Sequence, residues 1–378
     1  MEHAGKIRVL RVMARFNLGG PAQQITSLMT HLNRDVFEQK LVVGLCAPDE
    51  IDYSEIRNLD FSIERNIYLG RKISLFSDFL AILTMVRTYY RFRPHIVHSH
   101  TTKAGVICRL ARFFYFPKVD LVHTFHGHLL YGYFNTFQTK FIINLEKLLA
   151  VITTKLITVG YRVKNELVDA GIAKSSKFLV IPPGICFIDV PHKNRSKGGE
   201  VKPSLLIGFV GRVTKIKRPD RFLEIVERIK GFDCEISFLV AGEGSLLDEM
   251  KRYSETRGLG IKFLGWISDV EPLFDELDIL ILTSDNEGTP ISIVQGAAHE
   301  CISLSTEVGS VEDVLIDGET GYICSTVDEF VQKIQFLYSN PSVLSTMKQE
   351  ARVFSRKNFS GTRLARDHEK LYREIIQS

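Results

Sequence analysis

The sequence contains no run of about 20 apolar residues, the length that a helix needs to cross the hydrocarbon core of a membrane. Its six cysteines are dispersed without a C-x-x-C pair, and no secretory signal precedes Lys6, so we expect free thiols in a reducing cytosol. The dinucleotide fingerprint G-x-G-x-x-G, the Walker phosphate loop and a D-x-D pair for a Mg²⁺-nucleotide are also absent. These absences argue against a membrane-spanning chain, a disulfide framework and several common nucleotide sites.

Length and composition favour a globular protein with two domains. A chain of 378 residues is long for one hydrophobic core, and 45% hydrophobic with 24% charged residues is ordinary for a globular fold. The net charge of +4 is mild. It has two interpretations: a solvated surface, or an attraction to anionic nucleotides or an anionic membrane.

Short β-branched runs alternate with amphipathic helical patterns along the whole chain, which predicts a doubly wound α/β fold with parallel sheets. Pro21–Leu32 carries apolar residues at helical spacing and predicts the first helix. The predicted strands are Ile7–Ala14, Lys40–Cys46, Ile96–His100, Leu121–Phe125 and Leu156–Gly160, then Leu205–Gly211, Glu235–Ala241, Ile261–Leu264, Ile279–Thr283, Cys301–Ser305 and Gly321–Cys324.

A polar segment with two glycines and a proline, His192–Ser204, separates the two series of strands and predicts a linker. We therefore predict a first α/β domain over residues 1–195 and a second over residues 196–355. The end of the chain, Val343–Ser378, has a mostly helical pattern with a break near Ser360-Gly361, and residues 356–378 are the predicted C-terminal crossover helix.

Arg212 and Lys217 follow the strand Leu205–Gly211 and lie five residues apart across a βα turn. Ligands of open α/β sheets bind at this end of the strands. A guanidinium grips phosphate oxygens in a fork, and a lysine supplies a mobile charge. The pair predicts a phosphate site, and the alternative is a solvated basic loop.

Glu287 lies in the segment Asn-Glu-Gly-Thr-Pro, just after the strand Ile279–Thr283. Thr289 is the predicted N-cap of the next helix and Pro290 its first residue, so free N–H groups would face a ligand. Gln295 falls on the same face of this helix as Ser292, three residues further on. The carboxylate of Glu287 could accept hydrogen bonds from sugar hydroxyls, or it could be a solvent-facing charge.

Gly19-Gly20-Pro21 lies between the first strand and its helix. Two glycines let a ligand approach the backbone closely, and a helix N-terminus offers N–H groups to phosphate. The alternative is that the glycines serve the packing of a tight turn.

Five histidines gather in the first half at two strand ends. No carboxylate or cysteine stands at ligand spacing, so we predict no metal site. His123 is predicted to be a packed core residue. His126, beside Gly127, is better placed to face a cleft. The five are His98, His100, His123, His126 and His128.

Together these motifs resemble glycosyltransferase family 4 over nearly the whole chain. The segments that carry the resemblance are Gly19-Gly20, Thr124–His128 with Tyr131-Gly132-Tyr133-Phe134, Arg212 with Lys217, Gly242-Glu243-Gly244 and Glu287-Gly288-Thr289-Pro290. The resemblance implies a retaining enzyme of the GT-B fold. Two Rossmann-like doubly wound parallel-sheet domains would face a cleft, and the C-terminal helix would cross back to the first domain.

The resemblance also implies roles for the site residues. Arg212 and Lys217 would neutralise the donor diphosphate, and His126 and Glu287 would serve catalysis. Donor binding would further involve Gly20, Glu243, Ile267, Gly288, Thr289, Pro290 and Gln295. The family carries a glutamate that accepts hydrogen bonds from the ribose where this chain has Gln295, which keeps a carbonyl acceptor but loses the charge. The reaction would need no metal and no cofactor besides a UDP- or GDP-sugar as co-substrate.

We therefore expect a glycosyltransferase that moves a sugar from a nucleotide-diphosphate donor to a lipid-linked or oligosaccharide acceptor in surface polysaccharide biosynthesis. The alternatives are a sugar-nucleotide epimerase, which needs no acceptor, and a non-catalytic partner with the same fold. Location is expected to be cytoplasmic, with weak binding to the inner face of the membrane through basic-aromatic segments of the first domain. Those segments are Phe79–Val86, flanked by Arg71, Lys72, Arg87, Arg91 and Arg93, and Phe113–Phe116, flanked by Arg109 and Arg112. The alternative is an ordinary amphipathic helix with a solvated basic edge.

Overall fold

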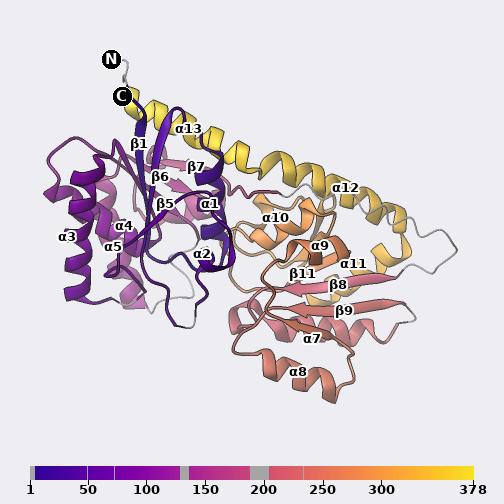
Figure 1. Cartoon of the computed structure of the whole chain (residues 1–378). Helices are drawn as coiled ribbons and strands as arrows, with labels where there is room; N and C mark the ends of the chain where they lie inside the picture. Colours follow the sequence, from indigo (N-terminus) through magenta and orange to yellow (C-terminus); the bar gives the residue numbers. More distant parts are fainter. Residues whose placement is uncertain (1–4, 49, 72, 128–135, 188–203, 233) are drawn as a thin grey trace. The chain divides into compact units, whose positions relative to one another are not determined.

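A computed structural model describes residues 5–48, 50–71, 73–127, 136–187, 204–232 and 234–378. The chain divides into two compact units, Met1–Cys186 with Phe359–Ser378, and Phe187–Asn358 (Figure 1). The predicted boundary between residues 195 and 196, most of the predicted linker, and the Tyr131-Gly132-Tyr133-Phe134 segment lie outside the described residues.

The first unit is built on a seven-stranded parallel sheet in the order β3-β2-β1-β4-β5-β6-β7. Its strands are β1 (Ile7–Met13), β2 (Phe37–Val43), β3 (Ile63–Arg65), β4 (Ile96–His100), β5 (Asp120–Phe125), β6 (Lys155–Thr158) and β7 (Phe178–Val180). Its helices are α1 (Gly20–His31), α2 (Tyr53–Ile56), α3 (Leu75–Phe92), α4 (Thr102–Ala111), α5 (Thr136–Ile152), α6 (Tyr161–Asp169) and α13 (Gly361–Gln377), with 3₁₀ turns η1 (Arg112–Phe114) and η2 (Ser175–Lys177).

The C-terminal helix α13 completes the core of this first unit. Leu364, Leu371 and Tyr372 of α13 are buried in one cluster with residues of β1, β2 and β4. The helix packs closely against α1, because a Cβ atom at Gly361 would lie only 2.3 Å from Ser27 Oγ. A side chain at this position would force Ser27 or His31 of α1 to move. Residues more than 350 positions from the start of the chain are thus part of the N-terminal fold.

The second unit contains a six-stranded parallel sheet in the order β10-β9-β8-β11-β12-β13. Its strands are β8 (Leu205–Val210), β9 (Ile236–Ala241), β10 (Lys262–Gly265), β11 (Ile279–Leu282), β12 (Ile302–Ser305) and β13 (Gly321–Ile323). Its helices are α7 (Pro219–Ile229), α8 (Leu247–Thr256), α9 (Glu271–Glu276), α10 (Ile291–Ala298), α11 (Val327–Ser339) and α12 (Pro341–Asn358), with 3₁₀ turns η3 (Lys215–Lys217) and η4 (Val311–Asp313).

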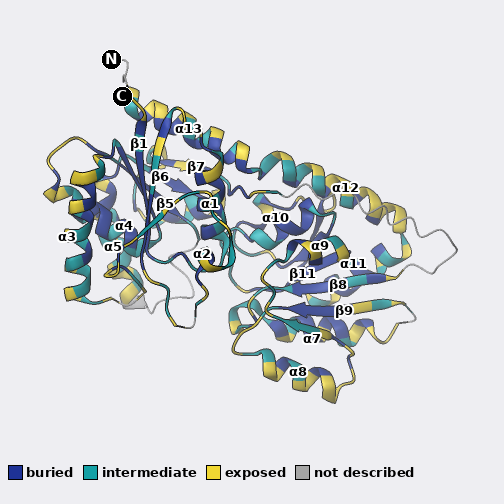
Figure 2. Cartoon of the chain, viewed as in Figure 1, coloured by how far each residue is buried: buried dark blue, intermediate teal, exposed yellow. Residues whose placement is uncertain are grey.

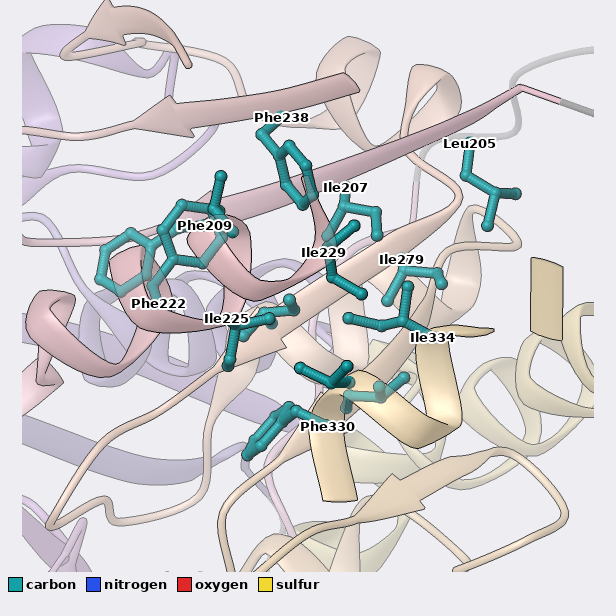
Figure 3. Close-up of a cluster of buried hydrophobic side chains, with 14 of the residues drawn as sticks. Leu205, Ile207, Phe209, Phe222, Ile225, Ile229, Phe238, Ile279, Phe330 and Ile334 are labelled. Atoms are coloured by element: carbon teal, nitrogen blue, oxygen red, sulfur yellow. The ribbon is translucent and has the colours of Figure 1, made fainter. Parts of the chain in front are cut away.

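The core of the second unit follows from helical and strand periodicity. In α7 the residues Phe222, Ile225, Val226 and Ile229 are buried, at the spacing of one helix face. They pack on side chains of β8 and β9, as Figure 3 shows, and each contributes about 1.5–3 kcal/mol relative to an exposed position. In both units the strands are largely buried, while the outer faces of α12 and α13 are exposed (Figure 2). The sheets therefore hold their carboxyl-terminal loops on a rigid base.

The predicted fold class of two Rossmann-like parallel-sheet domains is confirmed. Each predicted strand occurs, with ends shifted by up to three residues. Two short strands, β3 and β7, were not predicted. They lie at the two edges of the sheet and have three residues each, of which fewer are buried than in β13, a predicted strand of the same length. Among the described residues, no helix is both long enough and apolar enough to span a membrane.

Candidate functional site

The loops that follow β8, β9 and β10 are joined by main-chain hydrogen bonds. The N–H of Gly211 donates to the Ala241 carbonyl at 2.9 Å, and the N–H of Gly242 donates to the Gly265 carbonyl at 2.7 Å. Gly242 has φ of 145°, and a Cβ atom there would lie 1.9 Å from the Gly211 carbonyl oxygen. Glycine is therefore required where these loops meet. The three loops form one rim at the carboxyl end of the sheet.

The predicted site residues Arg212, Glu243 and Ile267 all lie on this rim. Arg212 and Glu243 are exposed, and Ile267 is half-buried. The N–H of Val213 donates to the Glu243 carbonyl at 2.8 Å, which keeps the two loops adjacent. The side chain of Arg212 makes no hydrogen bond or ion pair with the described residues. Its guanidinium is therefore available to an anionic ligand.

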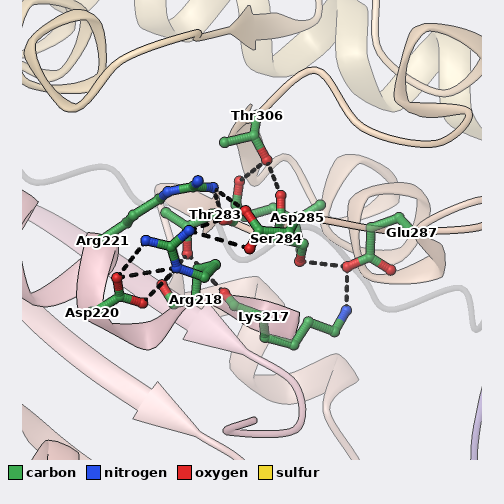
Figure 4. A network of polar contacts seen from close by, with 10 residues as sticks. Lys217, Arg218, Asp220, Arg221, Thr283, Ser284, Asp285, Glu287 and Thr306 are labelled. Carbon is green, nitrogen blue, oxygen red and sulfur yellow. Dashed lines mark hydrogen bonds and ion pairs between the residues drawn. The ribbon is translucent and has the colours of Figure 1, made fainter. Parts of the chain in front are cut away.

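Lys217 differs from Arg212 because it already has a partner. Its ammonium contacts Oε1 of Glu287, and the two side chains are 19% and 12% exposed (Figure 4). The hydroxyl of Ser284 donates to the same Oε1 at 2.6 Å. The other oxygen, Oε2, makes no hydrogen bond with the described residues. The structure thus brings Lys217 and Glu287 together, and it leaves one carboxylate oxygen open.

Hydrogen bonds of Thr283 and Ser284, the two residues that follow β11, hold the loops that carry this ion pair. The Thr283 hydroxyl lies 3.0 Å from the Lys217 carbonyl oxygen and 2.9 Å from the Arg218 carbonyl oxygen, so it holds the turn that carries Lys217. The Thr306 hydroxyl donates to the Ser284 carbonyl at 2.7 Å. Thr283, Ser284 and Thr306 are all buried. These residues fix both members of the ion pair by hydrogen bonds in a place shielded from water.

Ion pairs at the surface also connect the loops that follow β8 and β11. Arg218 has φ of 50°, in the left-handed region, and its guanidinium pairs with Asp220 at 2.7 Å and Asp285 at 3.2 Å. The hydrogen bond that Arg218 donates to Asp220, followed by the one it donates to Asp285, raises the pKa of Arg218 above its usual value. Arg221 pairs with Asp285 at 2.8 Å. Arg218 and Arg221 are therefore structural, in contrast to Arg212.

The segment after Glu287 leads into α10. The N–H of Ser310 donates to the Gly288 carbonyl at 2.9 Å, and a Cβ atom at Gly309 would lie 2.1 Å from the Glu287 carbonyl oxygen. The N-cap of α10 is Pro290, without a side-chain hydrogen bond. The prediction that Thr289 is the N-cap is therefore wrong by one residue, because α10 begins at Ile291.

Gln295 lies in the second turn of α10 and is 8% exposed. Its side chain makes no hydrogen bond with the described residues. An amide at this depth costs free energy unless it finds a partner. A ligand that offers hydroxyl groups to α10 would supply one.

In the first unit, His126 follows β5 directly. Its Nε2 lies 2.9 Å from Nδ1 of His100 at the end of β4. Burial lowers the pKa of His126 to about 4, so its ring is neutral near pH 7. His123 is buried, as predicted, and its Nδ1 lies 2.9 Å from the Ser99 hydroxyl. His126 and His123 therefore occupy different environments.

The remaining predictions of the first unit concern Gly20 and metal ligands. Gly20 is the first residue of α1 and is followed by Pro21. Its contact with a diphosphate stays a prediction. Within the described part of the chain no group of histidine, cysteine or acidic residues could hold a metal ion, and His128 lies outside it.

Sequence reasoning missed the residues that hold the site in place. Ser284 stands three positions before Glu287, but a serine after a strand is too common to be a signal. Thr283 and Thr306 were also missed, because their partners are 65 and 22 residues away in sequence. No local spacing reports such contacts.

Comparisons with known proteins show which sequences and folds this chain is similar to. Residues 18–186 match the family described as Glycosyltransferase Family 4, and residues 204–340 match the family described as Glycosyl transferases group 1. CapM of Staphylococcus aureus, a capsular polysaccharide biosynthesis glycosyltransferase, is 24% identical over 339 residues, which are 86% of this chain and 89% of CapM.

A second relative and a solved structure extend the comparison. The UDP-Gal:alpha-D-GlcNAc-diphosphoundecaprenol alpha-1,3-galactosyltransferase of Escherichia coli is 24% identical over 303 residues, 75% of this chain and 76% of that enzyme. The crystal structure of HepE from Anabaena in complex with UDP matches with a TM-score of 0.77, covering 97% of this chain and 100% of HepE. At 16% sequence identity this match shows a shared fold.

Proposed function

This chain belongs to the family 4 glycosyltransferases, and we propose that it transfers a sugar from a UDP-sugar to a lipid-linked oligosaccharide acceptor with retention of configuration. The observation that carries the proposal is the arrangement in the second unit. The unpaired Arg212 lies on the rim of the sheet, while Ser284 and Lys217 hold Glu287 with one oxygen open. Two cations and an ordered carboxylate suit a diphosphate and a sugar.

The diphosphate is the group that Arg212 and Lys217 serve. In the transition state of glycosyl transfer, negative charge grows on the leaving diphosphate, and fixed cations stabilise it more than they stabilise the ground state. Arg212 offers a fork of N–H donors without losing an existing partner. Lys217 shares its ammonium between Glu287 and the diphosphate, because an ammonium has three donors.

The transferred sugar is the group that Glu287 serves. Its Oε1 already accepts from Ser284 and Lys217, so Oε2 is the oxygen that accepts from sugar hydroxyls. Because the carboxylate is fixed before the sugar binds, little ordering entropy remains to oppose binding. UDP is the proposed nucleotide because the structural relative HepE binds UDP and the Escherichia coli relative uses UDP-galactose. No metal or cofactor takes part in the proposed reaction.

The acceptor is proposed from the relatives. The Escherichia coli enzyme acts on a sugar joined to undecaprenol through a diphosphate, and CapM acts in capsule synthesis. A lipid-linked acceptor lies at a membrane surface, and the first unit carries a suitable face. On α3 the side chains of Phe76, Phe79 and Leu83 are 73%, 54% and 46% exposed at helical spacing.

Basic residues flank this apolar stripe, and we propose that it binds an anionic membrane surface. Arg71, Arg87 and Arg91 are exposed near or on α3, where Lys/Arg residues attract anionic lipids. The expectation that Arg109 belongs to this face is wrong. Arg109 is 1% exposed and forms a bidentate ion pair with Glu146, at 2.8 and 3.0 Å. Lys72 lies outside the described residues.

An assay of the purified protein with a panel of UDP- and GDP-sugars tests the proposed reaction. We expect transfer to an undecaprenyl-diphosphate-linked sugar from a UDP-sugar, detected as a glycolipid of higher mass. His126→Ala should lower turnover while the Kd for UDP is kept. An altered donor sugar without acceptor would identify an epimerase instead. Nucleotide binding without any product would favour a non-catalytic partner.

A further inference from the structure

A buried polar network in the first unit has a defined hydrogen-bond direction. The guanidinium of Arg11 can only donate, and it lies 3.3 Å from the Tyr372 hydroxyl. Tyr372 therefore uses its own proton toward His98 Nδ1, at 2.6 Å. His98 then carries its proton on Nε2 and donates it to the Thr124 hydroxyl at 2.7 Å. The tautomer of His98 follows from one arginine at the start of the network.

His100 and His126 form a hydrogen bond whose direction no arginine sets. Nδ1 of His100 lies 2.9 Å from Nε2 of His126. Burial lowers the pKa of both rings, well below the usual value for His100 and to about 4 for His126, so each ring carries one proton near pH 7. One of the two nitrogens must donate and the other accept. The direction decides which group His126 presents through its other nitrogen, Nδ1.

The other nitrogen of His100, Nε2, is buried and has no partner among the described residues. If His126 donated, His100 would carry its proton on this nitrogen, as a buried donor without an acceptor. If His100 donates, the nitrogen is a bare lone pair. Among backbone groups, unpaired buried N–H donors are rarer than under-satisfied acceptors, and we apply the same preference to the imidazole nitrogen. This favours donation from His100 to His126.

The buried histidine His368 shows the same pattern independently, and His123 is compatible with it. In His368, Nδ1 lies 2.9 Å from the Leu364 carbonyl, which can only accept, so the unpaired Nε2 carries no proton. The Nδ1 of His123 lies 2.9 Å from the Ser99 hydroxyl, which also lies 3.3 Å from the Val122 carbonyl oxygen. When the Ser99 proton goes to that carbonyl, His123 donates from Nδ1 and its unpaired Nε2 is bare.

We infer that His100 is a positioning residue that donates Nδ1–H to Nε2 of His126 and so holds His126 in the Nδ1–H tautomer. His126 then presents an N–H donor, not a base, to an oxygen of the substrate. Nδ1 of His126 has no partner among the described residues. That the N–H group of His126 contacts substrate rests on the proposed function, whereas the tautomer of His126 does not.

The surroundings hold His100 in the required orientation. Its ring lies on that of His98, with centroids 4.2 Å apart, and His98 is fixed at both nitrogens. One of these two partners, Tyr372, comes from α13. The C-terminal helix therefore supports the orientation of His126 through Tyr372, His98 and His100, without contact to substrate.

Nuclear magnetic resonance on histidine-¹⁵N-labelled protein at about pH 7.5 tests the tautomer directly. Two-bond ¹H–¹⁵N correlations show which ring nitrogen carries the proton, and the His126→Ala spectrum assigns the signals. We expect the proton of His126 on Nδ1. A proton on Nε2 in the wild-type protein would overturn the inference, whether or not the protein transfers sugar. Absence of transfer with the expected tautomer would count against the proposed function alone.

Variants of His100 test its positioning role. His100→Asn places an amide donor where Nδ1 was, so it should keep the His126 tautomer and most of kcat. His100→Leu removes the donor, so His126 should gain the Nε2–H tautomer and kcat should fall about tenfold or more, with the Kd for UDP unchanged. His123→Leu, which removes a buried ring whose hydrogen bond is made to Ser99 and not to His126, is the matched control. An unchanged His126 spectrum in His100→Leu would overturn the inference.

Discussion

Arg212 and Lys217 are both predicted to bind the diphosphate, yet the structure gives them different roles before the ligand arrives. Arg212 is exposed and has no partner among the described residues, whereas Lys217 contacts the 12%-exposed carboxylate of Glu287. Arg212→Ala should therefore leave the stability of the free protein unchanged. Lys217→Ala should also destabilise it, because a largely buried carboxylate loses its cation.

The expected magnitude for Arg212 follows from the bonds it makes to an anion. A hydrogen bond to a charged group contributes about 1.5–3 kcal/mol, so Arg212→Ala should raise the Kd for UDP about 10- to 150-fold. Isothermal titration calorimetry with UDP measures this loss, and thermal unfolding without ligand measures stability. Lys215→Ala is the matched control, because Lys215 is an exposed cation on the same loop.

The comparison of the three variants can contradict the assignment clearly. If Arg212→Ala binds UDP as tightly as Lys215→Ala and the wild-type protein do, the rim of the second unit is not the diphosphate site. If Arg212→Ala lowers the melting temperature as much as Lys217→Ala does, the guanidinium has a structural partner. The premise that the Arg212 side chain has no partner in the protein without ligand would then be wrong.

Three further predictions concern the support of the site, its departure from the family pattern and its response to acid. Ser284→Ala removes the 2.6 Å hydrogen bond to Glu287 and should lower kcat about tenfold with little change in the Kd for UDP. Ser284→Thr keeps the hydroxyl and should restore activity. Equal kcat values for the wild-type protein and both variants would show that Glu287 does not need this hydrogen bond. Gln295→Glu should tighten UDP binding through charge-assisted hydrogen bonds to the ribose, and calorimetry with 2′-deoxy-UDP should show no such gain. Equal affinities of the wild-type protein and the variant for UDP and for 2′-deoxy-UDP would place residue 295 away from the ribose. His126 has a pKa of about 4 in the folded protein and about 6.5 in the unfolded protein, so the unfolded state binds more protons between these pH values. The folded protein therefore loses stability as pH falls from about 6.5 to 4. At pH 5 this residue alone should lower the free energy of unfolding by about 2 kcal/mol. Urea unfolding at pH 7 and pH 5 should show this loss reduced in His126→Ala, and an equal loss in both proteins would mean that the ring is not buried in its neutral form.

Much of the fold could be predicted because its signals are local. Alternating β-branched runs and helical patterns mark strands and helices within windows of a few residues, and a parallel sheet brings the strand ends to one edge. That is why residues just after β8 and β11 could be predicted as a site before any contact was known. The strands β3 and β7 were missed because a short strand with few buried residues carries little pattern. The first residue of α10 was misplaced because a single capping position carries little pattern as well.

The sequence by itself determined which chemical groups stand at the strand ends. Only the tertiary structure decided their partners. Lys217 and Glu287 are 70 residues apart, and His98 and Tyr372 are 274 apart. Arg109 looked like a surface cation in sequence, but packing buries it against Glu146. The physical reason is that periodicity reports which face of an element is buried, whereas a hydrogen bond depends on which distant element packs there. Free and paired cations, and the tautomer of a buried histidine, are therefore properties of the fold.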